Sequence, residues 1–295
     1  MAPRMDTRRP EWPEGSNCGP GGSNCDCGGM RMMVRVGKGT AALFSAVVMF
    51  LLLMAQTFGA AKAGLTVLRV GADPDFRPVS YTDASGKMVG SDVDFATELA
   101  ARLGVPLHYE GVAWDGIIPA LLAHKIDAIT NMVITDKRKE VVAFSMPYNV
   151  QFITTVVRAD RPDFNPGKDD LAKLRVGVMV STSAAQALEG IPGVKPTSYN
   201  TVADEYNDLM LGRIDVVAIE SANAGYTTKS IYPGKLRVTN QDLTSAPSYG
   251  GVALRKEDTA LLQAVNEAIK AMLADGSLVR ITKKWYGDAR LIPNQ

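Results

Sequence analysis

The chain has 295 residues, which is enough for one large domain or two smaller ones. Its hydrophobic share of 46% and charged share of 21% are those of an ordinary globular protein. The 32 Lys and Arg nearly balance the 31 Asp and Glu, so the charge gives no argument for a nucleic-acid partner. All cysteines, Cys18, Cys25 and Cys27, precede residue 30. With no histidine near them they make a poor zinc pattern, and the rest of the chain has no thiol chemistry.

The first 63 residues have the composition of an export signal. Residues 30–38 are cationic, residues 41–55 form an uninterrupted apolar run, and the A-K-A triplet that ends at Ala63 suits a signal peptidase. Because a membrane-spanning helix needs about 20 apolar residues, we expect a cleaved signal and a periplasmic protein. An uncleaved anchor is the alternative, and the start codon, Met1 or one near Met30, stays open.

Two stretches of the remaining chain repeat one pattern. The sequence LRVG occurs at 68–71 and again at 174–177. Residues 121–129 (LLAHKIDAI) are matched by residues 209–217 (LMLGRIDVV), each being the end of a helix, a turn and a buried strand. Such alternation predicts an α/β fold with mostly parallel sheets flanked by helices. Two copies of the unit predict two lobes.

Several helix starts are expected from capping residues. Ser91 is a candidate N-cap, and Thr135 is another, with Asp136 in the first turn where a negative charge meets the helix dipole. Ser183 and Gln186 resemble a capping box for a further helix.

Three helices show an apolar stripe at helical spacing, which predicts the faces that pack on the sheets. The stripe positions are Val93, Ala96, Leu99 and Leu103; Leu262, Val265, Ile269 and Met272; and Leu278, Ile281 and Trp285. Gly276 and Gly287 are expected to end the last two helices.

Arg138 would lie in the first turn of the helix that follows Thr135. A guanidinium beside unpaired backbone N–H groups is a suitable site for a carboxylate. Taken alone, a solvated arginine at a helix start is the simpler interpretation.

The chain from about Leu65 to Gly287 resembles the periplasmic amino-acid-binding proteins of ABC importers, solute-binding protein family 3. The phrases that carry the resemblance are LRVGADPDFRP (68–78), VGSDVDFATELAARLG (89–104), WDGIIPALL (114–122), KIDAI (125–129), VITDKR (133–138), AFSMPY (143–148), YGGVALRK (249–256) and KKWYG (283–287). Together they are highly specific for the fold and less so for the ligand.

The resemblance implies a two-lobed periplasmic-binding-protein fold of type II with a two-strand hinge. Lobe I would be residues 64–157 plus 251–295, and lobe II residues 158–250. The extended runs 151–158 and 249–255 are the expected crossing segments between the lobes.

Family position also implies ligand contacts. Arg138 would pair with the ligand α-carboxylate through two parallel hydrogen bonds, and Thr182 with Ser183 would donate to its other side. Glu220 would face the α-ammonium. The remaining implied contacts are two aromatic residues that flank the ligand side chain, Phe76 and Trp114.

Each of these positions has a structural alternative. Phe76 and Trp114 would serve equally as core aromatics, Glu220 as a surface carboxylate at a strand end, and Thr182 and Ser183 as helix caps only. His108 and His124 lie far apart in the sequence, and we expect no metal site.

Some positions depart from the family pattern. Asn131 stands where Gly or Ser is usual, Val133 replaces a common Thr or Ser donor, and Met179 replaces a polar or charged residue. Ser91 and Val79 replace phenylalanines, so the packing of lobe I is expected to differ. The loss of polar side chains argues against a strongly anionic ligand side chain such as that of glutamate.

The resemblance therefore implies a monomeric binding protein, with no cofactor, that delivers an amino acid or close derivative to the membrane permease of an ABC importer. An enzyme on the same scaffold, similar to the periplasmic cyclohexadienyl dehydratases, is the first alternative, with Glu220 as the obvious acid or base. A soluble sensor that serves a separate receptor is the second.

Overall fold

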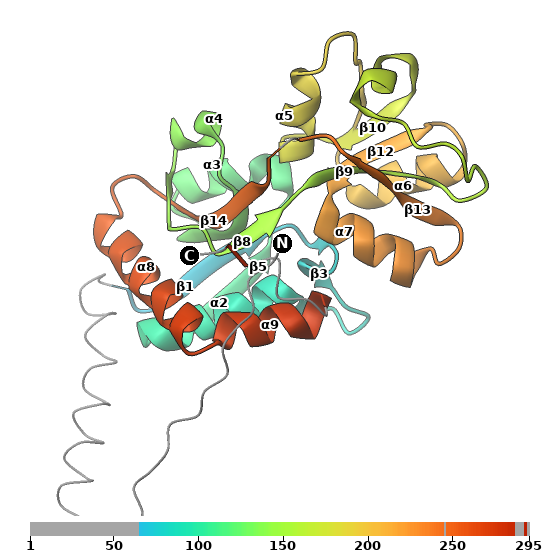
Figure 1. Cartoon of the computed structure of the whole chain (residues 1–295). Helices are drawn as coiled ribbons and strands as arrows, with labels where there is room; N and C mark the ends of the chain where they lie inside the picture. The colour runs from blue at the N-terminus through green and yellow to red at the C-terminus, as the bar shows by residue number, and fades with distance from the viewer. Residues whose placement is uncertain (1–64, 245, 287–291, 294–295) are drawn as a thin grey trace, which may run out of the picture. The chain divides into compact units, whose positions relative to one another are not determined.

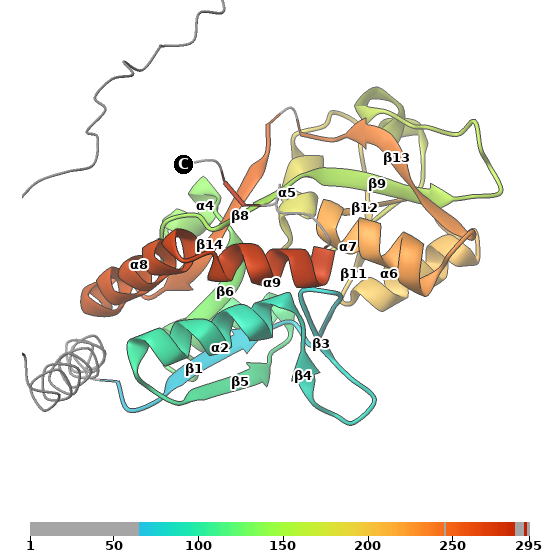
Figure 2. The same ribbon diagram turned by 60° about the horizontal axis from the view of Figure 1, so that its bottom comes forward.

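A computed structural model of the chain describes residues 65–244, 246–286 and 292–293. The expected signal peptide, its cleavage site and the helix end at Gly287 lie outside these residues. Two α/β lobes, each with its own sheet, make up the described chain (Figures 1 and 2). Among the described helices none is long and apolar enough to cross a membrane.

The sheet of lobe I has the strand order β5-β1-β6-β14-β7, and β8 also pairs with β14. β1 runs parallel to β5 and β6, whereas β14 runs antiparallel to β6, β7 and β8. The bounds are β1 Leu68–Ala72, β5 Leu107–Gly111, β6 Ala128–Val133, β7 Ala143–Phe144, β8 Asn149–Gln151 and β14 Ser248–Leu254.

Helices cover both faces of this sheet. α2 (Ser91–Leu103), α8 (Thr259–Ala274) and α9 (Ser277–Tyr286) lie side by side in Figure 2 and share one apolar core with β1. α3 (Ile117–Leu122) packs with β6 in a second core on the other face. Neighbouring residues of one strand enter different cores, Ala128 the first and Ile129 the second, as the alternation of side chains along a strand requires.

The sheet of lobe II has the order β11-β10-β12-β9-β13. Its bounds are β9 Ile153–Arg158, β10 Val176–Met179, β11 Thr197–Tyr199, β12 Val216–Glu220 and β13 Leu236–Asp242. One face packs on α5 (Ser183–Glu189) and the short 3-10 helix η2 (Lys168–Lys173). The other packs on α6 (Val202–Met210) and α7 (Ser221–Tyr226), which continues into the π-helical turn η3 (Thr227–Ile231).

Short elements surround the junction of the lobes. A small antiparallel sheet of β2 (Asp75–Phe76), β3 (Ser80–Thr82) and β4 (Met88–Val89) follows β1. The 3-10 turn η1 (Trp114–Gly116) precedes α3, and α4 (Asp136–Lys139) follows β6.

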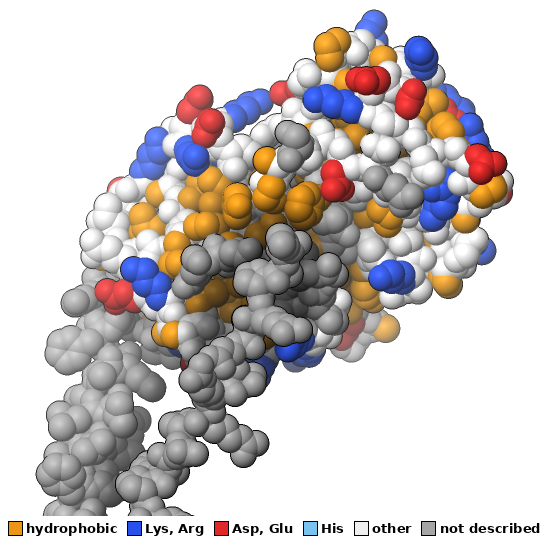
Figure 3. All heavy atoms as spheres, in the orientation of Figure 1, with side chains coloured by type: hydrophobic (Ala, Val, Ile, Leu, Met, Phe, Trp, Pro, Cys, Tyr) orange, Lys and Arg blue, Asp and Glu red, His pale blue; other side chains and the backbone are white. Residues whose placement is uncertain are grey.

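On the face seen in Figure 3, described side chains of both charges are mixed over lobe II.

The expected two-lobed α/β fold is confirmed, but each sheet is mixed rather than mostly parallel. In each, three neighbouring strands are parallel, and the added strands include one that enters from the other lobe. The chain leaves lobe I between β8 and β9 and returns between β13 and β14. The second passage runs in the direction opposite to the first. The crossing strands β9 and β14 pair antiparallel with β12 and β6, so both sheets contain antiparallel pairs.

The sheet in which a strand pairs shows the lobe to which that strand belongs, and this affects the lobe boundaries. All of β9 pairs within lobe II, although the expected boundary placed residues up to 157 in lobe I. Residues 248–250 of β14 pair with β8 in lobe I, although the expectation assigned them to lobe II. We therefore propose boundaries near residue 152 and residue 247.

The repeated phrase forms the same structure twice. Arg69 and Asp127 pair side chain to side chain, with Nη2–Oδ1 at 2.6 Å, and the Arg69 backbone N–H also donates to the carboxylate. Arg175 and Asp215 make the same set of bonds, with Nη2–Oδ1 at 2.8 Å. We call these pairs the lobe I clasp and the lobe II clasp. Each joins the start of the first parallel strand to the start of the strand beside it.

The glycine two residues after the arginine is closely packed against an isoleucine in both copies. A Cβ added at Gly71 would lie 2.6 Å from Ile126 Cδ1, and one at Gly177 would lie 2.5 Å from Ile214 Cδ1. Real Cβ atoms do not approach so closely, so a larger residue at either position would have to displace the end of the isoleucine side chain.

The expected helix caps are partly correct. Thr135 caps α4 by accepting a hydrogen bond from the Arg138 N–H at 3.3 Å. Ser91 is the first residue of α2 rather than its cap, and its hydroxyl hydrogen-bonds that of Tyr286 at 2.6 Å. The expectation for Ser183 is wrong by one residue, because Thr182 is the cap of α5.

Candidate functional site

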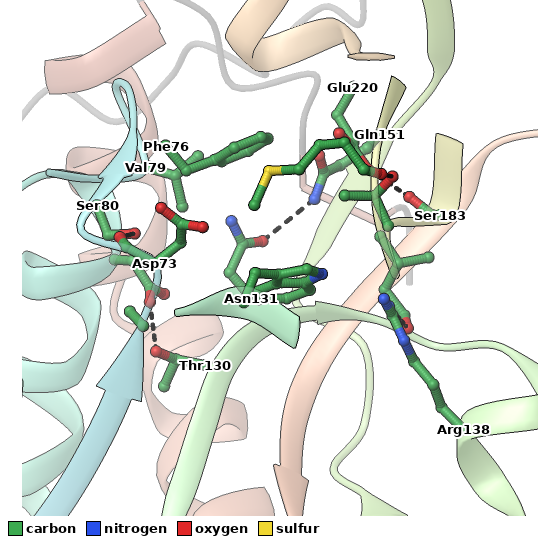
Figure 4. Close-up of a pocket in the computed structure, with 16 residues that line it drawn as sticks. Asp73, Phe76, Val79, Ser80, Thr130, Asn131, Arg138, Gln151, Ser183 and Glu220 are labelled. Carbon is green, nitrogen blue, oxygen red and sulfur yellow. Dashed lines mark hydrogen bonds between the residues drawn. The ribbon is translucent and has the colours of Figure 1, made fainter. Parts of the chain in front are cut away.

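A cavity of about 510 Å³ lies where the carboxyl ends of the parallel strands of the two sheets meet (Figure 4). This edge is where open α/β sheets bind ligands. All nine predicted ligand residues line the cavity: Phe76, Trp114, Asn131, Val133, Arg138, Met179, Thr182, Ser183 and Glu220. Sequence positions up to 144 residues apart are therefore brought together, and their contact with a ligand remains a prediction.

Arg138 lies at the wall of the cavity and is only 4% exposed. Its Nη1 donates to the Val133 carbonyl at 2.8 Å and its Nη2 to the Ser181 carbonyl, across the lobe junction, at 2.8 Å. No carboxylate of the described residues lies within 4.0 Å of it. Burial lowers the pKa of the guanidinium, which the charge of Glu220 partly offsets, but an arginine stays protonated. It retains N–H donors for an anion.

Trp114 holds the same lobe junction. Its indole N–H donates to the Ser181 carbonyl at 3.1 Å, so this one oxygen accepts from two lobe I side chains. The Arg138 Cζ lies 5.5 Å from the centre of the Trp114 ring, within cation–π range. Trp114 and Phe76 are both half-buried and also pack against apolar residues of lobe II, so they line the cavity and contribute to a core at once.

Glu220 ends β12 on the lobe II side of the cavity, where it is 6% exposed. The Ser183 hydroxyl donates to its Oε1. The Thr182 hydroxyl accepts from the Ala185 N–H at 3.1 Å and donates to the Met179 carbonyl at 2.8 Å. The side chain of Thr182 is thus occupied as a helix cap, and Ser183 serves the carboxylate.

The three cavity positions that depart from the family pattern differ in what they present to the cavity and in their hydrogen bonds. Asn131 has a positive φ of 52°, its N–H donates to the Tyr148 hydroxyl at 2.6 Å, and its side-chain oxygen accepts from Gln151 Nε2 at 3.3 Å. Val133 supplies its carbonyl to Arg138 and its side chain to the wall. Met179 presents a thioether at the end of β10.

Sequence reasoning did not identify Asp73, which follows β1 at the cavity edge and points into the cavity in Figure 4. Burial raises the pKa of its carboxyl group to about 6, and the Asp75 N–H, which donates to its Oδ1 at 2.8 Å, counteracts part of that rise. Its position directly after a parallel strand was a signal that could have identified it.

Asp92, in the first turn of α2, was also missed. It is fully enclosed and accepts from the hydroxyls of Thr130, Tyr109 at 2.9 Å and Tyr148 at 3.4 Å. Burial raises the pKa of Asp92 to about 6 despite these hydrogen bonds, the strongest of which comes from Thr130. Gln151, at the end of β8, together with Ser80 and Thr130, completes the described polar lining residues that were not predicted.

Known proteins resemble this chain over most of its length. A sequence profile of the bacterial extracellular solute-binding proteins, family 3, matches residues 68–288. The L-cystine-binding protein TcyJ of Escherichia coli strain K12 is 35% identical over 222 residues, 75% of this chain and 82% of that protein. The L-arginine-binding protein of Pseudomonas aeruginosa is 33% identical over 239 residues, 78% of this chain and 90% of that protein.

The fold is also found among solved structures. The ancestral amino acid-binding protein AncCDT-1, described as a precursor of cyclohexadienyl dehydratase, superposes with a TM-score of 0.69 at 34% identity. The match covers 75% of this chain and 96% of that one. The chain belongs to the bacterial extracellular solute-binding proteins, family 3.

Proposed function

We propose that the protein captures an amino acid or a close derivative between its lobes in the periplasm and delivers it to the permease of an ABC importer. The observation that carries this proposal is the pair of buried, opposite charges that line one cavity. Arg138 contributes a buried guanidinium with free donors from lobe I, and Glu220 contributes a buried carboxylate from lobe II. A zwitterion satisfies both.

The ligand α-carboxylate is assigned to Arg138 and the α-ammonium to Glu220. Each charge-assisted hydrogen bond contributes about 1.5–3 kcal/mol net. Because the two groups come from different lobes, the ligand stabilises the arrangement in which both lobes contact it. Ser181, whose carbonyl accepts from Arg138 and Trp114, adds direct lobe-to-lobe bonds to that arrangement.

The charge of the cavity favours a cationic side chain on the ligand. Among the described residues three carboxylates line it, those of Asp73, Asp92 and Glu220, against the one guanidinium of Arg138. With pKa values of about 6, the first two carry charge at neutral pH. Once the zwitterion has paired Arg138 and Glu220, the negative charges that remain repel an acidic side chain and attract a basic one.

A dehydratase function is the second candidate, because AncCDT-1 is described as a precursor of such an enzyme. The named relatives TcyJ and the P. aeruginosa protein are binding proteins. The pairing of Glu220 with Ser183 suits a fixed counter-charge for an ammonium, so we propose that the protein is not an enzyme.

The test is mass spectrometry of the small molecule released when protein purified from its own periplasm is denatured. We expect a cationic L-amino acid or a close derivative in a near one-to-one ratio. Incubation with prephenate and arogenate provides the other arm, since formation of a keto acid or an aromatic amino acid from them would establish the enzyme instead.

A further inference from the structure

A second cavity, of about 490 Å³, lies directly behind the ligand cavity. It is lined by residues of α2, α9 and β8, and by Ala222 of lobe II. Asp92, Asn131 and Gln151 line both cavities, so these three side chains form the partition between them.

The side chain of Gln151, one of the three that form the partition, is held by few hydrogen bonds. The side chain is 4% exposed, and within the described chain its one hydrogen bond runs from Nε2 to Asn131 Oδ1, at 3.3 Å (Figure 4). Its Oε1 is buried and finds no partner among the described residues. A buried carbonyl oxygen without a donor is destabilising, and an N–H group on a bound molecule would satisfy it.

The rear cavity suits a hydrogen-bond donor. Its described lining contains the carboxylate of Asp92 and the hydroxyls of Tyr148 and Tyr286, but no Lys, Arg or His. The small side chain of Ser91 leaves the space open between α2 and α9, where its hydroxyl meets that of Tyr286 at 2.6 Å. The cavity therefore combines these negative and accepting groups with apolar side chains such as Leu278 and Ile281, a lining that suits an aliphatic chain with a donor at its end.

We propose that the ligand site continues past Gln151 into the rear cavity, and that it takes amino acids whose long side chains end in N–H donors, such as a guanidinium. Gln151 is the specificity-determining residue: it accepts a hydrogen bond from the end of that side chain as the chain passes the partition. This extension rests on the proposed function, because it requires the α-carboxylate and α-ammonium to be held at Arg138 and Glu220.

A series of side-chain lengths tests the extension by isothermal titration calorimetry. The probes are L-ornithine, L-arginine and L-homoarginine, which has one methylene more than arginine. A pocket closed at the partition rejects an additional methylene by about tenfold or more. We expect instead that L-homoarginine binds within about threefold of L-arginine, a difference well under 1.4 kcal/mol.

Two variants locate the effect. Gln151→Leu should weaken L-homoarginine by about tenfold or more, the loss of one hydrogen bond to a charged group, while L-ornithine changes little. Ser91→Leu should do the same by filling the rear cavity, and it serves as a second test should Gln151→Leu not fold. Gln263→Leu, the same substitution on the exposed side of α8, is the matched control. Circular dichroism and melting temperature show which variants are folded.

The outcomes separate this inference from the proposed function. If L-homoarginine is rejected about tenfold or more by the parent, or if folded variants weaken all three probes equally, the extension is wrong and the proposed function stands. The extension is also wrong, with the proposed function intact, if the protein binds only amino acids without a donor-ended side chain. If it binds none of the probes, none of the twenty L-amino acids and no amino-acid derivative recovered from the purified protein, the proposed function itself fails.

Discussion

The two lobes contain the same Arg–Asp clasp in different surroundings. In lobe I the Asp127 side chain is 3% exposed and accepts a further hydrogen bond from Arg255 at 3.2 Å. In lobe II the Asp215 side chain is 17% exposed, and its partner Arg175 is 56% exposed, against 37% for Arg69. Hydrogen bonds from the arginines hold the pKa of Asp215 below its usual value and outweigh burial to do the same for Asp127.

At their carboxyl ends, the strands that begin at the two clasps differ more between the lobes than the clasps do. Counted from LRVG, Asp73 of lobe I and Met179 of lobe II occupy equivalent positions, and both line the ligand cavity. One presents a carboxylate and the other a thioether. The two copies thus share the residues that fix the strands at one edge of each sheet and differ at these positions of the ligand edge. Variants at the clasps should alter stability, and variants at the ligand edge should alter affinity.

The largest effect is expected from breaking the lobe I clasp. Asp127→Asn removes a buried carboxylate shared by Arg69 and the almost fully buried Arg255, and loss of one partner of a buried pair costs about 3–5 kcal/mol. Urea denaturation of the ligand-free protein measures it. A change of less than 1 kcal/mol, on the order of a surface pair, would show that the clasp does not secure lobe I.

At the ligand edge, Glu220→Gln should lower affinity by about 2–5 kcal/mol, because the ligand ammonium loses its counter-charge in the closed site. The melting temperature of the ligand-free protein should hardly change, since the variant keeps the size of the side chain and a hydrogen-bonding partner for Ser183. Calorimetry with the recovered amino acid gives the affinity, and Glu189→Gln, an exposed position in the same lobe, is the control. Equal affinity in variant and parent would refute the role of Glu220.

Lobe II also carries a buried acid that neither clasp nor ligand accounts for. Glu205 on α6 is 0% exposed, and neither of its oxygens has a hydrogen-bond partner among the described residues. Burial, and then the charge of Glu220, raise the pKa of its carboxyl group well above 4.5, and the nearby backbone N–H of Met179 counteracts part of that rise. We expect Glu205→Met to stabilise the ligand-free protein at pH 7 by about 1–3 kcal/mol, the cost of an unsatisfied buried polar group.

The pH dependence of this gain has a definite sign. The folded parent binds the Glu205 proton more tightly than the unfolded chain does, so its stability falls as pH rises above about 4.5. The advantage of Glu205→Met should therefore be smallest near pH 4 and grow toward pH 8. Denaturation curves across this range measure it, and an advantage that is the same at every pH would contradict the account.

The smallest effect belongs to the lobe II clasp. Asp215→Asn breaks a pair whose arginine is largely solvated, so we expect a loss of only about 0.2–1 kcal/mol. Measured beside Asp127→Asn under the same conditions, it gives the difference between the clasps directly. Equal losses in the two variants would show that burial does not separate them.

Much of this structure could be predicted from the sequence because its signals are local. The LRVG and I-D repeats mark strand starts in both lobes, and the phrase around Arg138 marks a helix start beside the cavity. Asp73 was missed although its place directly after a parallel strand marks the ligand edge of the sheet. Gln151 was missed for a physical reason: whether a residue in a crossing strand faces the ligand depends on how the two lobes meet, which no single element encodes. Ser183 was misplaced by one residue because Thr182 beside it caps equally well.

The central claim is that Arg138 anchors the α-carboxylate of an amino acid. Calorimetry with the recovered amino acid and its α-amide tests it in the parent, in Arg138→Ala, in Arg138→Lys and in the exposed control Lys137→Ala. The parent and the control should strongly prefer the free acid. Arg138→Ala should lose about 3–5 kcal/mol of affinity for the acid and most of that preference. Arg138→Lys should recover only part, because an ammonium cannot offer two parallel donors. If folded Arg138→Ala keeps the full preference for the acid, Arg138 is not the anchor and the account is wrong.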